Sequence, residues 1–183
     1  MSIEYRGSCD AESPDQICRS IAQSQFGVIT RKQAQEAGLS TNQFDRRVAA
    51  GIFARIHPTV YRLVGVPASW KGRLFAAQEW AGDRAVVSHR AAAKLYSLDG
   101  IDEEYIELTT TGSSCRSRPG VVLHRTSELE QKDWRSKHPF RVTTPERTIC
   151  DLASVLSSAA LESALESALR LRLTTLRRIA QMS

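Results

Sequence analysis

The apolar positions of residues 27–64 change from helical to strand-like spacing along the segment. Residues 31–37 are a polar stretch whose alanines recur at helical spacing. Gly38 is expected to end this stretch, because glycine enters the left-handed conformation without a steric penalty. Phe44 and Val48 lie four residues apart and form the apolar stripe of a second helix. The pattern therefore predicts two helices joined by a tight turn.

The second predicted helix has clear boundaries and is followed by two strand-like runs. Ser40 and Gln43 have the spacing of a capping box, and Gly51 is expected to end the helix. Residues 52–56 and 59–63 are rich in residues that favour strands, and the His-Pro dipeptide between them predicts a turn. Two helices followed by such a hairpin are typical of a winged helix-turn-helix.

The polar face of the second helix carries side chains suited to base edges in DNA. Arginine bonds guanine with two donors, and asparagine or glutamine does the same for adenine. Residues 31–62 hold six Lys or Arg against two acids, and the arginines of the hairpin are expected to contact phosphates. The residues predicted to bind DNA are Arg31, Lys32, Ser40, Thr41, Asn42, Gln43, Asp45, Arg46, Arg47, Arg55, His57 and Arg62.

A helix-turn-helix also occurs as a plain packing motif, and adjacent arginines on a helix are usually solvated. Here the turn, the cap, the apolar stripe and the hairpin agree along one continuous segment, which favours DNA binding. The alternative is a winged helix that serves only as a protein-interaction module, with the rest of the chain performing the function.

The whole chain is expected to have an α+β fold in two domains. Residues 1–12 are predicted to be a disordered leader, and residues 13–65 the winged helix-turn-helix domain, which starts with a helix at 16–25. Residues 66–183 are predicted to form a C-terminal α+β domain, a small sheet flanked by helices. Its predicted helices lie at 68–82, 89–98 and 145–155, with two more after residue 157, and its predicted strands lie at 85–87, 105–109, 121–124 and 139–142.

Three expectations within this second domain rest on short segments. Residues 105–109 alternate apolar and polar side chains, as a half-buried strand does, and residues 121–124 are the expected partner strand. Residues 112–120 form a basic loop between them, which is either a solvated hairpin tip or a contact to phosphates or an acidic partner. Ser88 is expected to cap the helix that follows it, and residues 127–138 carry no predicted element.

Composition narrows the class of protein only a little. The 183 residues carry a net charge of +5, which permits a polyanionic partner without demanding one. The four cysteines form no CxxC pair, so we expect reduced thiols in a cytoplasmic protein. The polar N-terminus lacks the apolar segment of a signal peptide, and no apolar run is long enough to span a bilayer.

No catalytic, cofactor or metal site is expected from the sequence. An E-x-K pattern at residues 130–132 resembles the tail of a metal-dependent nuclease motif, but it lies in a polar turn rather than on a strand. The acidic residues at 99–104 lack the spacing of a calcium loop. His89 and His124 each stand alone in the sequence. We therefore expect a binding protein and not an enzyme.

Five phrases occur in series along the chain. They are GVITRKQAQEAGLS, RIHPTVYRLVG, SHRAAAKLYSLDG, RPGVVLHRT and VTTPERTICDLA. Together they resemble the AbiEi-type antitoxin family of type IV toxin–antitoxin systems, and the similarity covers roughly residues 25–180.

The resemblance implies a winged domain that binds inverted repeats in its own promoter and represses its operon, with residues 40–47 reading DNA and residues 55–62 as the wing. It implies that the C-terminal domain counters a toxin of the nucleotidyltransferase class. Many relatives continue into a Vsr-like endonuclease domain, whereas this chain stops at Ser183, so a regulator without the nuclease is expected. A regulator that has no toxin partner, the operator sequence and the oligomeric state all stay open.

Overall fold

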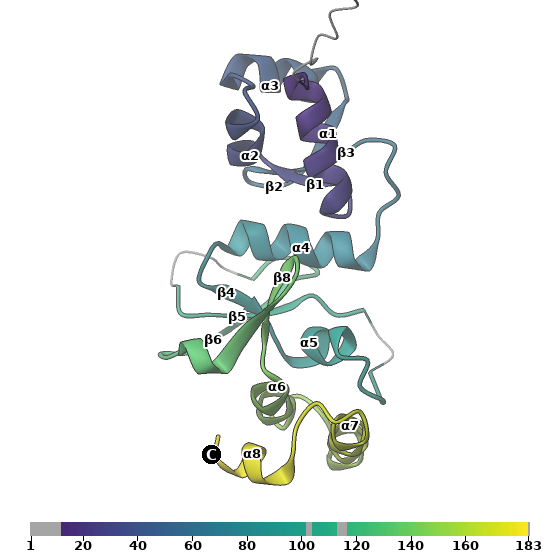
Figure 1. Ribbon diagram of the computed structural model, residues 1–183, viewed down its shortest axis with the longest axis vertical. Helices are drawn as coiled ribbons and strands as arrows, with labels where there is room; N and C mark the ends of the chain where they lie inside the picture. The colour runs from purple at the N-terminus through teal and green to yellow at the C-terminus, as the bar shows by residue number, and fades with distance from the viewer. Residues whose placement is uncertain (1–11, 102–103, 113–116, 183) are drawn as a thin grey trace, which may run out of the picture. The chain divides into compact units, whose positions relative to one another are not determined.

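The structure is a computed structural model that describes residues 12–101, 104–112 and 117–182 (Figure 1). The chain divides into two compact units, Met1–Pro67 (unit 1) and Ala68–Ser183 (unit 2). Each unit combines helices with one sheet, which confirms the predicted α+β class. The leader predicted at 1–12 falls, apart from Glu12, on residues outside this description.

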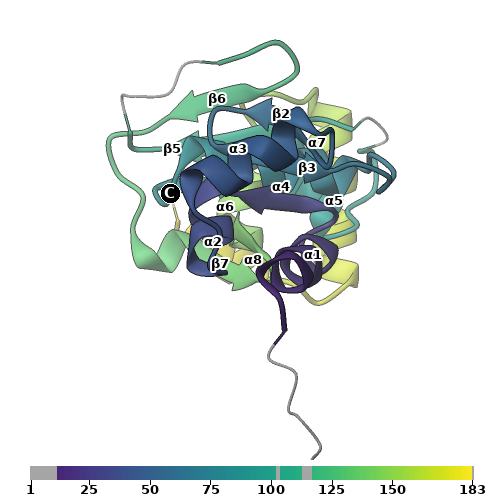
Figure 2. The same cartoon turned by 90° about the horizontal axis from the view of Figure 1, so that it is seen from above.

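Unit 1 has the element order of a winged helix-turn-helix. Its helices are α1 (Pro14–Ser24), α2 (Arg31–Glu36) and α3 (Thr41–Ala49), and its strands are β1 (Val28–Thr30), β2 (Phe53–His57) and β3 (Val60–Leu63). The strands form an antiparallel sheet of order β1-β3-β2, in which β2 and β3 make the predicted hairpin. Figures 1 and 2 show the three helices gathered about this sheet.

The three helices of unit 1 begin by the same local mechanism. Ser13, Thr30 and Ser40 each accept a hydrogen bond from the backbone N–H three positions on, where a glutamine side chain bonds the cap residue in return. Gly38 lies between α2 and α3 with φ at 98°, a conformation that glycine adopts without strain. Helix α1 begins at Pro14, because proline suits the first helical turn.

Strand β1 was not predicted. In this strand Val28 pairs with Arg62 and Ile29 with Tyr61. A strand of three residues is too short to show an alternating pattern in the sequence.

The apolar stripe of α3 closes the core of unit 1, as predicted. Phe44 is fully buried, with its ring 5.3 Å from that of Phe53 and 4.8 Å from that of Tyr61, the latter edge-on. Val48 packs partly buried against the same cluster. Burial of one such phenylalanine stabilises the fold by about 1.5–3 kcal/mol, so α3 is held firmly by one face.

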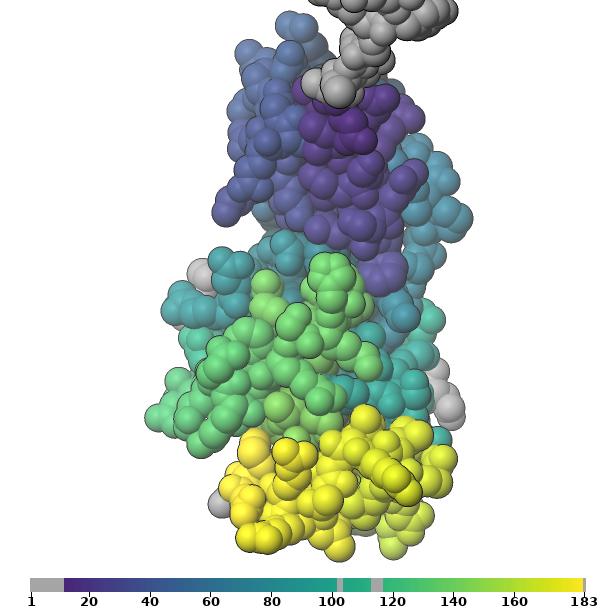
Figure 3. All heavy atoms as spheres, in the orientation of Figure 1, coloured from purple at the N-terminus to yellow at the C-terminus, as the bar shows by residue number. Residues whose placement is uncertain are grey.

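Unit 2 is built on a mixed sheet of order β6-β5-β4-β8-β7. Its strands are β4 (Ala85–Val87), β5 (Glu107–Thr110), β6 (Val122–Arg125), β7 (Trp134–Lys137) and β8 (Phe140–Thr143), and its helices are α4 (Trp70–Ala81), α5 (His89–Leu95), α6 (Pro145–Leu152), α7 (Ser158–Arg170) and α8 (Leu176–Ala180), with a 3-10 turn η1 (Gln131–Asp133). Figure 1 shows α4 on one side of the sheet and α5 and α6 on the other. The side chains of α7 and α8 form a continuous yellow part of the unit's surface (Figure 3).

Strands β5 and β6 pair in parallel. Glu107 lies opposite Val122, and Thr110 lies opposite Arg125. Parallel strands need a crossover connection, so the segment at 112–120 is not the tip of a hairpin, which was one of the two predictions for it. Residues 113–116 of this segment lie outside the described residues.

The prediction that β5 is half-buried is wrong. All four of its residues, Glu107 included, are buried. The strand lies between β4 and β6, and α4 and α5 both contact it, so neither face reaches solvent. The polar side chains of β5 are therefore part of the interior of unit 2.

Several smaller boundaries also differ from the prediction. Strand β7 lies in the segment at 127–138, where no element was predicted, and Trp134 pairs with Thr143 of β8. Helix α5 ends at Leu95 and α6 at Leu152, both earlier than predicted.

Among the described residues, no helix combines the length and the apolar character that a membrane span requires.

Candidate nucleic-acid interface

The outer side of α3 brings together several of the residues predicted to bind DNA. An α-helix turns by about 100° per residue, so burial of Phe44 leaves Asn42 and Arg46 on the opposite side with Asp45 at their flank, and all three are exposed. The side chains of Arg46 and Asn42 have no hydrogen bond or ion pair among the described residues. Their amide and guanidinium groups are therefore available to a ligand.

Other predicted residues hold the start of α3 in place. Ser40 and Gln43 bond each other's backbone N–H groups in the capping box, at 3.3 and 2.9 Å. Thr41 Oγ1 accepts a hydrogen bond of 3.1 Å from Gln35 of α2. These bonds fix how α3 follows α2, and so they set the direction in which its exposed face points.

Arg31 is enclosed at the first position of α2. Its Nη2 donates to Asp45 Oδ1 at 2.6 Å and to the Tyr61 hydroxyl at 2.8 Å. Its guanidinium carbon also lies 5.2 Å from the centre of the Phe44 ring. Arg31 thus joins α2, α3 and β3, and its charge is paired within unit 1.

Arg47 is likewise paired, unlike its neighbour Arg46. Its guanidinium makes a two-pronged contact with Asp15 of α1, with a distance of 2.6 Å from Nη2 to Oδ2. Nη1 also donates to the backbone carbonyl of Gln43 at 2.8 Å. Figure 3 shows side chains of α1 and of the α2–α3 region side by side on the surface of unit 1.

The wing contributes a second group of predicted residues. Arg55 is exposed, Arg62 and His57 are half-buried, and neither arginine side chain has a hydrogen bond or ion pair among the described residues. Ala54 lies opposite Arg62, and the strand register shifts between Arg55 and His57. Ile56 lies within that shift and is exposed, a feature that the sequence pattern did not single out.

The ion pairs of unit 1 leave a set of unpaired positive charges on α3 and the wing. The hydrogen bond from Arg31 lowers the pKa of Asp45, and that from Arg47 lowers the pKa of Asp15, so both carboxyls stay ionised near neutral pH. Lys32 is highly exposed, with Glu36 at 3.9 Å. Among the described residues of α3 and the wing, the positively charged side chains with no hydrogen bond or ion pair are Arg46, Arg55 and Arg62, and these groups are able to meet phosphates or guanine.

Unit 2 contains a buried polar cluster that the sequence did not predict. The rings of His89 and His124 stack with centres 3.5 Å apart and an interplanar angle of 16°. Burial, and then the neighbouring His124, lowers the pKa of His89 to about 4. The two histidines stood alone in the sequence because one follows β4 and the other lies on β6, with β5 between those strands.

Glu107 is the charged centre of this cluster and is fully buried. Arg90 donates to its carboxylate from Nη2 at 2.6 Å, from Nε at 3.1 Å and from the backbone N–H at 2.9 Å. Burial alone would raise the pKa of Glu107, but His124 and Arg90 lower it to about 2. His124 Nε2 lies 3.4 Å from the carboxylate without a well-aligned hydrogen bond, so we ascribe the shift mainly to Arg90.

Ser88 does not cap α5 as predicted, although it occupies the N-cap position. Its hydroxyl instead accepts a hydrogen bond from Thr109 at 2.8 Å and lies 2.9 Å from His89 Nδ1. The hydroxyl is fully buried, so no substrate can reach it in this conformation.

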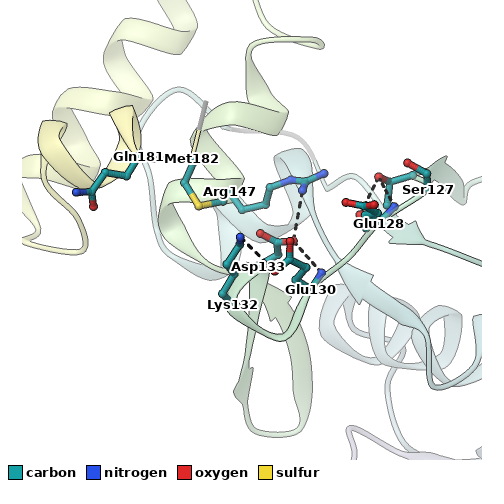
Figure 4. A pocket seen from close by; sticks show the side chains of 9 residues that line it. Ser127, Glu128, Glu130, Lys132, Asp133, Arg147, Gln181 and Met182 are labelled. Carbon is teal, nitrogen blue, oxygen red and sulfur yellow. Dashed lines mark hydrogen bonds and ion pairs between the residues drawn. The ribbon is translucent and has the colours of Figure 1, made fainter.

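A polar pocket of about 330 Å³ lies at another part of unit 2 (Figure 4). Lys132 and Glu130, the ends of the E-x-K pattern, form an ion pair of 3.1 Å at this pocket and lie on or beside η1 rather than on a strand. Asp133 accepts from the Glu130 N–H at 2.9 Å and lies 3.8 Å from Arg147. Within the described residues, no group of three or more His, Cys, Asp or Glu could hold a metal ion.

The element order and the exposed face of α3 place unit 1 in the winged-helix class of folds found in transcriptional regulators. Residues 16–64 match the family model described as a transcriptional regulator, AbiEi antitoxin. This segment runs from α1 to β3, so the resemblance is confirmed for the part of the chain that carries the candidate interface. Unit 1 is therefore similar to the AbiEi antitoxin family of transcriptional regulators. No curated protein matches the chain.

Proposed function

We propose that the protein is a DNA-binding transcriptional regulator that inserts the exposed face of α3 into the major groove of duplex DNA. The observation that carries the proposal is the presence of the unpartnered side chains Asn42 and Arg46 on the side of α3 opposite its buried stripe. Arginine and asparagine are the side chains that make two-point contacts to guanine and adenine. Lys32, Arg55, His57 and Arg62 would contact the phosphate backbone from α2 and the wing.

The twelve residues predicted from the sequence take different parts in this proposal. Asn42, Arg46, Thr41 and Asp45 would lie nearest to the bases. Ser40, Gln43, Arg31 and Arg47 are engaged in bonds that hold α3, so their main part would be to orient it.

We further propose that the DNA is the protein's own promoter, with an inverted repeat, and that binding represses the operon. The C-terminal unit would counter a toxin of the nucleotidyltransferase class, without catalysis of its own. The family match of unit 1 and the resemblance of the phrases in unit 2 support this proposal. Co-expression with the product of the neighbouring reading frame tests the toxin part, since growth should be arrested by that product alone and restored by the full chain.

A mobility shift tests the DNA-binding part with the full chain. The probes are the region upstream of the protein's own reading frame and a shuffled duplex of equal length and composition, at a low and a higher salt concentration. Non-specific binding rests on phosphate contacts and falls steeply with salt, whereas base contacts preserve a preference. The proposal is supported if, at the higher salt concentration, the protein still retards the upstream duplex but not the shuffled duplex. Equal retention of both duplexes contradicts it and favours a protein-interaction module.

A further inference from the structure

Asp45 is an acid on the surface that is proposed to face DNA. Its side chain is 53% exposed, and it is the only acidic residue of α3. A carboxylate on such a surface repels phosphates, so it weakens binding unless it meets a donor group on the DNA. The surroundings of Asp45 show how this carboxylate is held.

Arg31, at the start of α2, holds one carboxylate oxygen of Asp45 by a hydrogen bond. Its Nη2 lies 2.6 Å from Asp45 Oδ1, and the same nitrogen donates to the Tyr61 hydroxyl at 2.8 Å. The guanidinium carbon lies 5.2 Å from the Phe44 ring centre and 5.6 Å from that of Tyr61. These groups come from α3 and β3, so Arg31 has little freedom to move.

The second oxygen of Asp45, Oδ2, has no bonding partner among the described residues. The hydrogen bond from Arg31 keeps the Asp45 pKa below its usual range, so the carboxylate accepts hydrogen bonds and donates none. In the major groove, cytosine offers the N4 amine as a donor, whereas guanine and thymine offer acceptors at the matching edge. Adenine offers an amine beside the N7 acceptor, which a carboxylate meets less well.

We propose that Arg31 is a positioning residue that holds Asp45 so that Oδ2 accepts a hydrogen bond from the N4 amine of a cytosine. This inference rests on the proposed DNA-binding function and adds the base that one side chain selects. It also gives Arg31 a part different from a phosphate contact.

Selection from a randomised duplex pool tests the inference and requires no defined operator sequence. The full-length wild type is used to select duplexes, and sequencing gives the base preference at each position. We expect a position at which the wild type prefers cytosine to thymine by about tenfold, within the range of one base contact. In Asp45→Asn and Asp45→Ala, the preference at that position should fall to within about twofold and the other positions should stay unchanged.

Variants at Arg31 test the positioning step. Arg31→Ala should lose the cytosine preference at the same position, and Arg31→Lys should restore part of it because the positive charge is kept. Tyr61→Phe keeps the contact to Asp45 and should select like the wild type. Since Arg31→Ala removes contacts inside unit 1, circular dichroism checks folding, and the exposed Asp45→Asn variant decides the case if Arg31→Ala does not fold.

Two results would overturn the inference while leaving the proposed function standing. One is an unchanged base preference at every position in both Asp45 variants. The other is that Arg31→Ala weakens all duplexes alike and lowers the salt slope by about one phosphate, which would make Arg31 a backbone contact. A wild type that selects no sequence at all overturns the proposed function itself, so the two failures are distinguishable.

Discussion

Arg46 and Arg47 are neighbours in the sequence and differ entirely in their surroundings. The Arg46 side chain is exposed and has no partner among the described residues, whereas the Arg47 side chain is held by Asp15 and by the Gln43 carbonyl. The sequence places both in one basic pair, and only the fold separates a side chain free for DNA from one that ties α3 to α1.

This difference gives a prediction for two adjacent substitutions. Arg47→Ala should lower the free energy of unfolding of unit 1 by about 1 kcal/mol, as is typical when a partly exposed ion pair is lost, and should keep the sequence preference. Arg46→Ala should leave the free energy of unfolding unchanged and should reduce the preference for the specific DNA sequence. Urea unfolding followed by circular dichroism and a competition binding assay measure the two effects. Equal effects of both substitutions in both assays would contradict the assignment.

His89 gives a prediction about pH. Its folded pKa of about 4 lies below the ordinary value of 6.5, so between these values the unfolded chain binds more protons. Stability should therefore fall as the pH drops from 6.5 to 4, by up to about 3 kcal/mol from this residue. The ionised Glu107 contributes to the stability of the folded state, and this contribution is lost at lower pH, between 4.5 and about 2.

Tryptophan fluorescence measures this effect in unit 2, because all three tryptophans, Trp70, Trp80 and Trp134, lie there. Urea unfolding of His89→Gln should show a flatter dependence between pH 6.5 and 4 than the wild type. His138→Gln, a change at an exposed histidine, is the control and should keep the wild-type slope. An unchanged slope in His89→Gln would show that His89 is not the group that titrates.

At the scale of elements, α3 depends on its cap. The Ser40 hydroxyl bonds the Gln43 N–H at 3.3 Å, and loss of such a cap costs about 1 kcal/mol. Ser40→Ala should lower the free energy of unfolding of unit 1 by that amount, while Ser20→Ala, on the exposed side of α1, should stay within about 0.5 kcal/mol. Circular dichroism in urea measures both variants, and equal stability of the two would contradict the role of the cap.

The wing gives a prediction of a different kind. Arg55→Ala and Arg62→Ala should weaken binding to all DNA sequences alike, since phosphate contacts carry no base information. Each should lower the slope of log affinity against log salt by about 0.9, the value for one phosphate. Titrations at several salt concentrations measure the slope. A selective loss of the preferred sequence would instead place these arginines at base edges.

The elements that local signals specify could be predicted from the sequence. Helices α2 and α3 and the hairpin after them follow from Gly38, the Ser40 cap and the buried Phe44, all of which act within a few residues. Strands β1 and β7 could not be predicted, because each is short and lacks alternation. The parallel direction of β5 and β6 depends on a crossover that no local pattern encodes.

The candidate interface was predictable in its members but not in their roles. The wheel of α3 gives Asn42 and Arg46 as exposed residues from spacing alone. The pairing of Arg47 with Asp15 joins positions 32 residues apart, and that of Arg31 with Asp45 joins positions 14 apart. Such contacts arise only when the helices pack, so the sequence could not show which arginines are occupied.

At the scale of the whole molecule, the chain divides into two compact units after Pro67. The family match lies entirely within unit 1, and the buried cluster of His89, Glu107 and His124 lies entirely within unit 2. The net charge of +5 is spread over the chain, so the specific part of DNA binding is expected to depend on few residues. An exposed arginine elsewhere in unit 1, such as Arg19 on α1, should therefore contribute little to sequence preference.

The proposed function depends above all on the exposed face of α3 reading DNA sequence, and fluorescence anisotropy can measure that reading. The full chain is titrated into labelled upstream DNA in competition with shuffled duplex, for the wild type, Arg46→Ala and Arg19→Ala. We predict that Arg46→Ala reduces the difference in binding free energy between the two duplexes by about 1–3 kcal/mol. Arg19→Ala should leave that difference within about 0.5 kcal/mol of the wild type. A ratio near one for the wild type, or an equal loss in both variants, would contradict this function for α3.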